Sequence, residues 1–306
     1  MQEDALTSRI GNTPLLELKR LRPRDSRVRL FVKAEGFNPG GSVKDRAAWR
    51  IVRDALERGL LGKGQATTLV DASSGNTGIA YAMLGASLGF PVRIYLPSTA
   101  SPERKRLLKV YGAETVLTDP LEGSDGAIRA VKALVEKEGA SGRWFYADQY
   151  SNPLNPLAHY EGTAEEIWRQ TGGKVTHFIA GLGTSGTFCG TTRRLKELNP
   201  AIQCISFQPD GPFHGLEGMK HMASALVPAV YDARLADRDL ACSAEDAHAM
   251  CRRLAREEGI LAGISSGAAV TVALRVAAEL DAGLVVAMLP DGGDRYLSEE
   301  FWEASC

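Results

Sequence analysis

The sequence lacks the features that mark several special classes of protein. No apolar run approaches the roughly 18 residues of a membrane-spanning helix. The N-terminal stretch MQEDALTSRIGNTPLLEL has no basic segment followed by an apolar one, so no signal peptide is expected. The five cysteines are odd in number and include no C-x-x-C pair. This pattern favours reduced thiols in a cytoplasmic protein over a disulfide framework.

Excess charge and clustered metal ligands are absent as well. Lys and Arg number 36 against 37 Asp and Glu, which leaves a net charge of -1. A general nucleic-acid binder should be basic, so neither nucleic acid nor a membrane surface is expected as a partner. The histidines have no metal-ligand spacing among themselves or with cysteine, and we expect no metal site at His159, His177, His214, His221 and His248.

Short apolar segments alternate with longer segments of helical length. The expected strands are Thr68–Ala72, Val92–Leu96, Thr115–Leu117, Val175–Ala180, Ile202–Phe207 and Leu284–Leu289. The expected helices are Val43–Arg58, Thr77–Leu88, Pro102–Tyr111, Gly126–Glu138, Pro156–Thr171, Thr187–Leu198, Ala244–Glu258 and Gly267–Leu280. This alternation predicts an α/β fold with doubly wound, parallel-type sheets that are buried on both faces.

Two stretches without periodicity interrupt this pattern. Asp148–Pro156 (DQYSNPLNP) is the best candidate for a crossover between two α/β domains. Gln208–Tyr231 is long and irregular, and loops of that length are usually functional. Acidic and basic pairs such as Glu165–Glu166 are expected to face solvent on helices.

The first of four glycine-rich polar segments is Asn38–Arg46 (NPGGSVKDR). Ser42 and Asp45 have the spacing of a capping box, in which the serine hydroxyl accepts a hydrogen bond from an early helix N–H. Lys44 then falls in the first helical turn, where the positive end of the helix dipole lowers the pKa of its amine. A neutral amine is what a Schiff-base lysine requires. The alternative is a solvated lysine at a helix start.

The second segment, Ser73–Gly78 (SSGNTG), follows an expected strand and opens an expected helix. Hydroxyl groups and free backbone N–H groups at a helix N-terminus suit a carboxylate. The alternative is an ordinary capped turn between a strand and a helix.

The third segment, Gly181–Thr187 (GLGTSGT), also lies between an expected strand and an expected helix. Its hydroxyls and backbone N–H groups can hold a dianionic phosphate. Gly181, Gly183 and Gly186 also satisfy G-x-G-x-x-G, so an NAD-binding oxidoreductase is an alternative that leaves the first two segments unexplained.

The fourth segment, Gly263–Gly267 (GISSG), formally matches the nucleophile elbow of hydrolases. That fold needs an acid and then a histidine after the serine, and the last histidine here is His248. Ser265 is therefore interpreted as a hydrogen-bonding residue and not as a nucleophile.

Together, IGNTPL, PGGSVKDR, SSGNTG, DQYSNPLNP, GTSGT, GISSG and GDRYLS occur in an order that resembles the cysteine synthase (O-acetylserine sulfhydrylase) family. This family belongs to the fold-type II pyridoxal-phosphate enzymes, whose fold is similar to the tryptophan synthase β chain. The ending PDGGDRY is most similar to the B-type branch. The resemblance implies two domains: a smaller one at 39–150 with part of 1–16, and a larger one at 151–306 with approximately 17–38.

The resemblance also implies a role for each matched position. Lys44 would bind pyridoxal 5′-phosphate covalently, Asn76 would bond the 3′-oxygen of its ring, and Ser265 would face the ring nitrogen. The phosphate would lie in the cradle of Gly183, Thr184, Ser185, Gly186 and Thr187, where the family usually has glycine in place of Ser185. The substrate carboxylate would be bound by Ser73, Ser74, Gly75, Thr77 and Gln149.

The implied reaction makes L-cysteine by β-replacement. O-Acetyl-L-serine, or O-phospho-L-serine, would lose its leaving group to give an aminoacrylate, and sulfide or another sulfur donor would add to it. Cystathionine β-synthase and serine/threonine dehydratase are rivals within the same fold. A non-catalytic homologue is disfavoured because Lys44 is retained.

Two further expectations concern specificity and partners. Lys220 and His221 could attract a phosphate leaving group or an anionic sulfur donor, the alternative being two solvent-facing cations. The resemblance implies a homodimer. The sequence carries no signal for or against binding of serine acetyltransferase.

Overall fold

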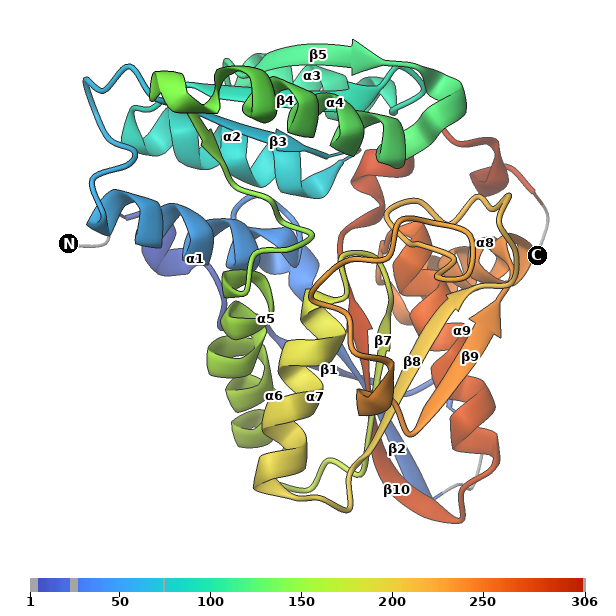
Figure 1. Ribbon diagram of the computed structural model, residues 1–306. Helices are drawn as coiled ribbons and strands as arrows, with labels where there is room; N and C mark the ends of the chain where they lie inside the picture. Colours follow the sequence, from blue (N-terminus) through green and yellow to red (C-terminus); the bar gives the residue numbers. More distant parts are fainter. Residues whose placement is uncertain (1–4, 23–26, 74, 305–306) are drawn as a thin grey trace.

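The computed structural model describes residues 5–22, 27–73 and 75–304. Two sheets organise this part of the chain, one above the other in Figure 1. The upper sheet has the order β5-β4-β3-β6 and is wholly parallel. Its strands are β3 (Thr68–Ala72), β4 (Val92–Pro97), β5 (Glu114–Thr118) and β6 (Trp144–Tyr146).

The lower sheet has the order β1-β2-β10-β7-β8-β9, in which only the β1–β2 pairing of the described chain is antiparallel. Its strands are β1 (Leu15–Leu18), β2 (Arg27–Ala34), β7 (His177–Gly181), β8 (Gln203–Pro209), β9 (Arg238–Cys242) and β10 (Ala282–Leu289). Strand β10 therefore lies between β2, from the start of the chain, and β7, from its middle.

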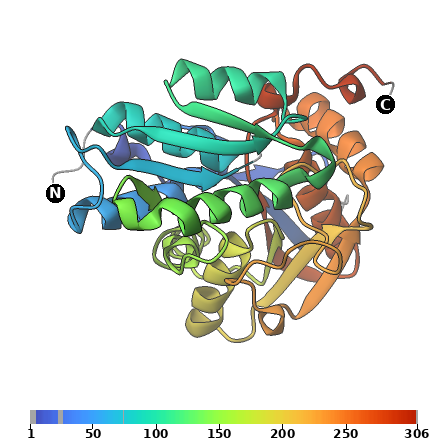
Figure 2. The ribbon, with the colours of Figure 1, turned by 45° about the horizontal axis from the view of Figure 1, so that its top comes forward.

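Helices cover both faces of the upper sheet. Residues of α4 pack with Val70 and Ala72 on one face, and residues of α1 and α2 pack with Leu69 and Ile94 on the other. Figure 2 shows α4 on the opposite side of these strands from α2. The helices of this part are α1 (Lys44–Glu57), α2 (Asn76–Leu88), α3 (Pro102–Val110) and α4 (Gly123–Glu138).

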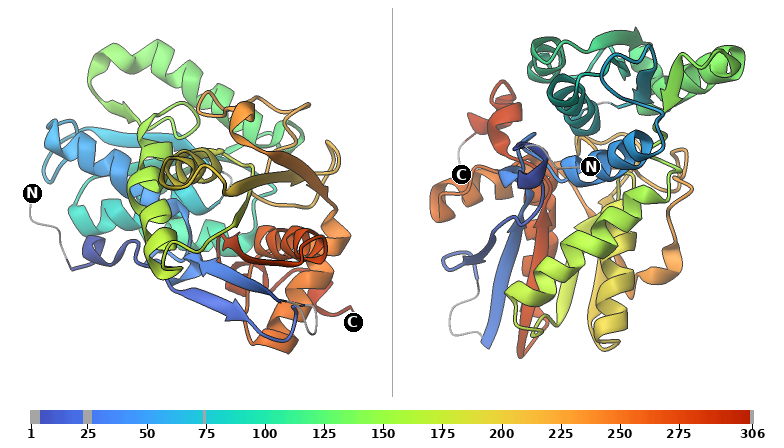
Figure 3. Two further views of the ribbon diagram at one scale, coloured as in Figure 1. Left: turned by 90° about the horizontal axis from the view of Figure 1, so that it is seen from below. Right: turned by 90° about the vertical axis from the view of Figure 1, so that its left-hand side faces the viewer.

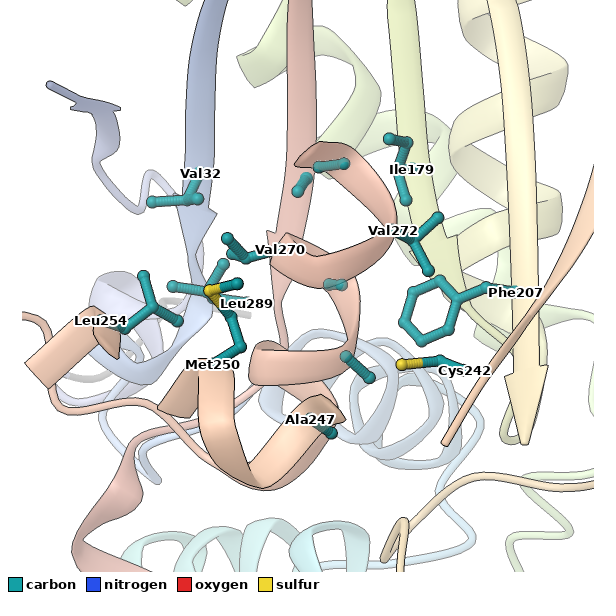
Figure 4. Close-up of a cluster of buried hydrophobic side chains, with 14 of the residues drawn as sticks. Val32, Ile179, Phe207, Cys242, Ala247, Met250, Leu254, Val270, Val272 and Leu289 are labelled. Atoms are coloured by element: carbon teal, nitrogen blue, oxygen red, sulfur yellow. The ribbon is translucent and has the colours of Figure 1, made fainter. Parts of the chain in front are cut away.

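The lower sheet is also covered on both faces, as the right-hand view of Figure 3 shows. Helices α8 (Ala244–Arg253) and α9 (Ile264–Ala278) cover one face, where Val270 and Val272 of α9 pack toward the strands (Figure 4). The other face packs against α6 (Ala164–Gln170) and α7 (Gly186–Leu198), with α5 (Leu154–Ala158) beside α7. The α/β fold with doubly wound, parallel-type sheets is confirmed.

Several expected boundaries differ from the structure. The helix expected over Pro156–Thr171 is divided into α5, a π-helical turn at His159–Thr163, and α6. The end of the helix expected over Ala244–Glu258 is likewise a π-helical turn, Leu254–Glu258. Strands β1, β2, β6 and β9 were not expected. The short 3-10 helices are Thr7–Arg9, Glu35–Phe37, Pro120–Glu122, Gly139–Ser141, Ala233–Leu235, Gly293–Tyr296 and Glu300–Trp302.

The expectation that every strand is buried on both faces is wrong for the edges. Strand β5 has exposed positions along most of its length, and β9 alternates partly buried and exposed positions. Edge strands have one neighbour only, so their side chains retain contact with water. The division into domains at 39–150 and 151–306 stays a prediction.

Of the acidic pair Glu165–Glu166, only Glu166 departs from the expectation of solvent exposure, with a side chain that is 12% exposed against 42% for Glu165. Glu166 accepts hydrogen bonds from Lys33 and Arg46, at 2.6 Å and 2.7 Å. Arg46 also pairs with Glu35 at 2.6 Å. Lys33 and Glu35 are fully buried, so this network ties β2 to α1 and α6 in the interior. A buried charge persists when partners of opposite charge surround it.

Within the described ranges, no helix combines the length and apolar character needed to cross a bilayer. The same residues gather no group of three or more His, Cys, Asp or Glu suited to a metal ion.

Candidate active site

A cavity of about 330 Å³ is lined by residues of both sheets and of the loops between them. Its volume is in the range of small-molecule sites. The predicted site residues that line it are Lys44, Ser73, Gly75, Asn76, Thr77, Gln149, Gly183, Thr184, Thr187, Lys220 and Ser265. Ser185 and Gly186 belong to the same loop as Gly183 but do not line the cavity, nor does His221. Ser74 lies outside the described residues.

Lys44 is the first residue of α1, and the turn before it is anchored to the end of β10. The amide of Val43 donates to the carbonyl of Pro290 at 2.8 Å. The hydroxyl of Ser42 accepts from the amide of Lys44 at 3.3 Å, but the N-cap residue of α1 is Val43, which makes no side-chain cap bond. The capping box itself is wrong, because the carboxylate of Asp45 accepts from the amide of Gly40 at 2.5 Å instead.

Lys44 lines the cavity, and its amine has no fixed partner there. Among the described residues, its Nζ has no hydrogen bond or ion pair. Burial lowers the pKa of Lys44, and the negative charge of Asp291 opposes this effect by raising it. A buried amine with a lowered pKa spends more time neutral, which is the form that attacks a carbonyl or accepts a proton.

The loop of residues 73–77, which we call the carboxylate loop, opens α2. The hydroxyl of Ser73 accepts from the amides of Gly78 and Gly75, at 2.9 Å and 3.2 Å, so Ser73 shapes the loop. Thr77 donates its hydroxyl to Gln149 Oε1 at 2.6 Å. Gln149 in turn donates to the carbonyl of Ala72 at 2.7 Å. The loop and Gln149, far apart in the sequence, therefore form one wall of the cavity.

The side-chain amide of Asn76 is held at both ends. Its Nδ2 donates to Asp291 Oδ2 at 2.7 Å, and its Oδ1 accepts from the guanidinium of Arg295. Asp291 is buried, and its Oδ2 also accepts from the hydroxyl of Tyr296 at 2.7 Å. Asp291 and Arg295 both lie within PDGGDRY, but the sequence alone indicates no role for either residue.

The loop of residues 183–187, which we call the phosphate loop, joins β7 to α7. Ser185 has a left-handed backbone with a φ of 67°, and α7 begins at the next residue. Helix N-termini leave backbone N–H groups without intrahelical partners. Within the described chain, the amides of 183–187 donate to no turn carbonyl or side chain, and the buried Ser185 Oγ has no partner.

Two residues behind the phosphate loop hold its hydroxyl groups. Asn155 donates to Thr184 Oγ1 at 3.1 Å, and His159 Nε2 lies 3.3 Å from Thr187 Oγ1. Burial lowers the pKa of His159 well below its ordinary value, so the ring is neutral. The sequence alone indicates no such role for either residue. Asn155 could have been found as a candidate site residue, because it lies within the segment DQYSNPLNP that resembles the family.

Ser265 lies in the first turn of α9 and lines the cavity. Residues on both sides of Ser265 are bonded to the segment that follows β10: Gly263 N and Ser266 Oγ both donate to the carbonyl of Asp291, at 3.2 Å. The helix begins at Ile264, three positions earlier than expected.

The loop of residues 210–231 closes one side of the cavity through two ion pairs with the upper part of the molecule. Glu217 pairs with Arg104 of α3, and Lys220 pairs with Asp125 of α4 at 2.7 Å. Lys220 is buried and its Nζ lies 5.2 Å from the ring centre of Tyr150. Lys220 is therefore no solvent-facing cation. His221 instead contacts Ser224 at 2.8 Å.

The residues of the cavity fit pyridoxal 5′-phosphate. An unpaired amine, Lys44, is available for its aldehyde. The phosphate loop, whose Gly183, Thr184 and Thr187 line the cavity, offers unpaired amides that suit a phosphate dianion. The chemistry of these donors, and not any bound group, carries this assignment.

Comparison with known proteins agrees with this geometry. The family described as "Pyridoxal-phosphate dependent enzyme" matches residues 6–291. The cysteine synthase of Aquifex aeolicus is 49% identical over 295 residues, covering 94% of this chain and 89% of that protein. Cysteine synthase B of Pseudomonas aeruginosa is 43% identical, with 99% of both chains covered.

A solved structure is similar throughout. The cysteine synthase (OASS) of Entamoeba histolytica superposes with a TM-score of 0.91 at 35% identity, covering 100% of this chain and 92% of that one. The fold and the cavity thus define a fold-type II enzyme that depends on pyridoxal phosphate. Within that class, the chain belongs to the cysteine synthase (O-acetylserine sulfhydrylase) family. Its activity is that of a cysteine synthase. The alternative of an NAD-binding oxidoreductase therefore has no support.

Proposed function

We propose that Lys44 holds pyridoxal 5′-phosphate covalently at this cavity. The phosphate loop binds the phosphate, Asn76 bonds the ring 3′-oxygen, and Ser265 faces the ring nitrogen. One observation carries the proposal: Lys44, with its unpaired amine, lines the same cavity as the phosphate loop and Ser265, which are distant in sequence.

When bound, pyridoxal phosphate supplies an electron sink for negative charge at the substrate Cα. Lys44 Nζ removes the Cα proton as general base, and its lowered pKa suits that task. The carboxylate loop and Gln149 bind the substrate carboxylate, which fixes the Cα–H bond relative to the amine. The ion-paired loop of residues 210–231 limits the entry of water, which would convert the substrate to pyruvate.

The hydroxyl of Ser265, placed at the ring nitrogen, favours one reaction of the substrate, loss of its β-leaving group, over another, transamination. An acidic partner at the ring nitrogen would keep that nitrogen protonated and strengthen the sink, whereas a serine does not. A weaker sink favours loss of a β-leaving group over transamination. This balance agrees with β-replacement.

The amino-acid substrate in this proposal is O-acetyl-L-serine, and the sulfur donor is sulfide. O-Phospho-L-serine is a second candidate because Lys220, a buried cation, lines the cavity. Its pairing with Asp125 means that an incoming phosphate must compete with a carboxylate for the ammonium group.

Reduction with borohydride tests the cofactor assignment. In the wild-type protein, the modified peptide should contain Lys44. Lys44→Ala should lose the visible absorbance of the bound cofactor, whereas Lys174→Ala, which changes an exposed lysine, should retain it. A modified peptide elsewhere in the chain, or an unchanged spectrum for Lys44→Ala, would refute the proposal.

The role of Lys220 is tested by substrate preference. Lys220→Ala should lower kcat/KM for O-phospho-L-serine more than for O-acetyl-L-serine, with sulfide and thiosulfate compared as donors. An unchanged ratio between the two amino acids would exclude Lys220 as a specificity residue. His221→Ala is the matched control, because His221 lies beside Lys220 but does not line the cavity.

The assembly proposed for the enzyme is a homodimer, on the basis of family membership. Sedimentation equilibrium of the purified chain measures its mass directly. A mass of one chain across the accessible concentration range would contradict the proposal.

A further inference from the structure

Asp291 joins the three segments that are proposed to contact the cofactor. It follows β10 and is 2% exposed. Its carbonyl accepts from the turn that begins α9, while its neighbour Pro290 accepts from Val43 beside Lys44. Its side chain reaches Asn76 of the carboxylate loop. A substitution at Asp291 leaves the hydrogen bonds of its main chain in place, so the role of its carboxylate can be tested separately from them.

The carboxylate of Asp291 determines which way the amide of Asn76 faces. A carboxylate only accepts hydrogen bonds and a guanidinium only donates them. Asn76 is placed between the two, with Nδ2 toward Asp291 and Oδ1 toward Arg295. The reversed amide would set oxygen against oxygen and N–H against N–H. One N–H of Asn76 remains, and Asn76 lines the cavity.

A second feature distinguishes Asp291 from a purely structural acid. Its Oδ1 is buried and has no hydrogen-bond partner among the described residues. Leaving such an oxygen unpaired costs free energy, so a structural role alone gives no reason to keep a charge there. The charge of Asp291 also acts on Lys44.

We propose that Asp291 is a positioning residue, whose carboxylate holds Asn76 in the one orientation that presents an N–H to the ring oxygen of the cofactor. This inference rests on the proposed function. Tyr296 holds the carboxylate in place through its hydroxyl at 2.7 Å, and Arg295 completes the arrangement from the opposite side of Asn76.

Spectra of the holoenzyme and a double-mutant cycle test the inference. Asp291→Ala should shift the visible absorbance of the bound cofactor and weaken its binding by roughly tenfold to a hundredfold, as when a residue that orients a ligand is removed. Asn76→Ala should do the same. The double variant should be little worse than either single variant, because the two residues act as a unit.

Two further variants serve as controls. Asp294→Ala changes an exposed acid nearby and should leave the spectrum unchanged. Asp291→Asn retains the size of the side chain and remains usable where Asp291→Ala does not fold. The side-chain amide of Asp291→Asn can still accept a hydrogen bond from Asn76 but carries no charge. The Asp291→Asn variant should therefore bind the cofactor better than Asp291→Ala but less well than the wild type.

The apoenzyme supplies a readout that does not involve the cofactor. The negative charge of Asp291 raises the pKa of Lys44. In Asp291→Ala, which lacks this charge, the pKa of Lys44 should therefore be lower. The pH at which an amine reagent modifies Lys44 at half its maximal rate should fall accordingly. The charge of Lys44 also acts on His159, whose pKa burial lowers well below its ordinary value, so that its ring is neutral.

The outcomes separate this inference from the proposed function. If wild-type borohydride labelling falls on Lys44 while Asp291→Ala matches Asp294→Ala in spectrum and cofactor affinity, the positioning role is refuted and the proposed function stands. Fully additive losses for Asp291→Ala and Asn76→Ala would also refute it. If the wild-type labelling misses Lys44, the proposed function itself fails.

Discussion

Arg104 of α3 and Glu217 of the loop after β8 form an ion pair that fastens this loop to the upper part of the molecule. The guanidinium of Arg104 is almost fully buried, and its Nη2 donates to the hydroxyl of Tyr296 at 2.8 Å. Because Arg104 also lies against Gly75 of the carboxylate loop, this pair connects the covering loop to the proposed substrate site.

Glu217→Gln should therefore loosen the loop of residues 210–231. We expect KM for the amino-acid substrate to rise by about tenfold, equivalent to about 1.4 kcal/mol, with a smaller change in kcat. Steady-state kinetics and limited proteolysis of the loop measure both effects. Glu279→Gln breaks an exposed pair with Arg238 and is the control. Equal KM values for the two variants would contradict the prediction.

Ser185 provides a test of backbone strain in the phosphate loop. A left-handed backbone costs a residue other than glycine about 1–2 kcal/mol, so Ser185→Gly should stabilise the apoenzyme by about 1 kcal/mol. Ser185→Ala retains the strain but removes the hydroxyl. If Ser185 Oγ binds the phosphate, both variants should bind the cofactor more weakly. Thermal unfolding of the apoenzyme should rank Ser185→Gly above Ser185→Ala, and the reverse order would show that the strain is absent.

Gly183 allows the phosphate loop to approach the loop of residues 210–231 closely. A Cβ at Gly183 would collide with the carbonyl oxygen of Gly218, so Gly183→Ala must displace main chain. We expect a loss of about 1–3 kcal/mol in stability and weaker cofactor binding. At Gly211, on the same covering loop, nothing lies within 4 Å of such a Cβ. Gly211→Ala should match the wild type in a cofactor titration, and equal effects of the two changes would contradict the prediction.

Glu166 should make stability dependent on acid pH. Burial acts to raise the pKa of Glu166, but hydrogen bonds and charges from Arg46 and Lys33 outweigh burial and lower it from 4.5 to about 2. Stability from this group is complete above pH 4.5 and is lost as pH falls toward 2, a change of about 3 kcal/mol.

Urea unfolding at pH 6 and at pH 3 measures this contribution. Glu166→Gln should be less stable than the wild type at pH 6, and the difference should shrink at pH 3. Glu165→Gln, which changes a more exposed neighbour, should show a small difference at both values. A constant difference for Glu166→Gln would exclude the ion network as its cause.

The fold could be predicted in outline because apolar strands and helical segments alternate in the sequence. Strand β2 was missed because its sequence, RVRLFVKA, carries Arg27, Arg29 and Lys33. Lys33 is tolerated in a buried strand only because Glu166 and the Thr13 carbonyl, both distant in sequence, surround its ammonium. The division of the helix at Pro156–Thr171 was missed because one inserted residue changes helical periodicity very little.

The glycine-rich turns could be predicted as parts of the site because their hydroxyl groups, glycines and helix N-termini lie within a few residues of one another in the sequence. Asp291, Arg104 and His159 act through partners far along the chain, and no local pattern indicates such pairs. Asn76 and Asp291, for example, are 215 positions apart. Family resemblance supplied the roles of Asn76 and Ser265, which the residues alone left open.

The position of β10 between β2 and β7 has a consequence for biosynthesis. On the ribosome, β2 and β7 emerge well before the strand that must separate them. The lower sheet therefore cannot close until residues 282–289 have been made. Until then, a growing chain already contains Lys44 but lacks the complete cavity in which Lys44 could bind the cofactor.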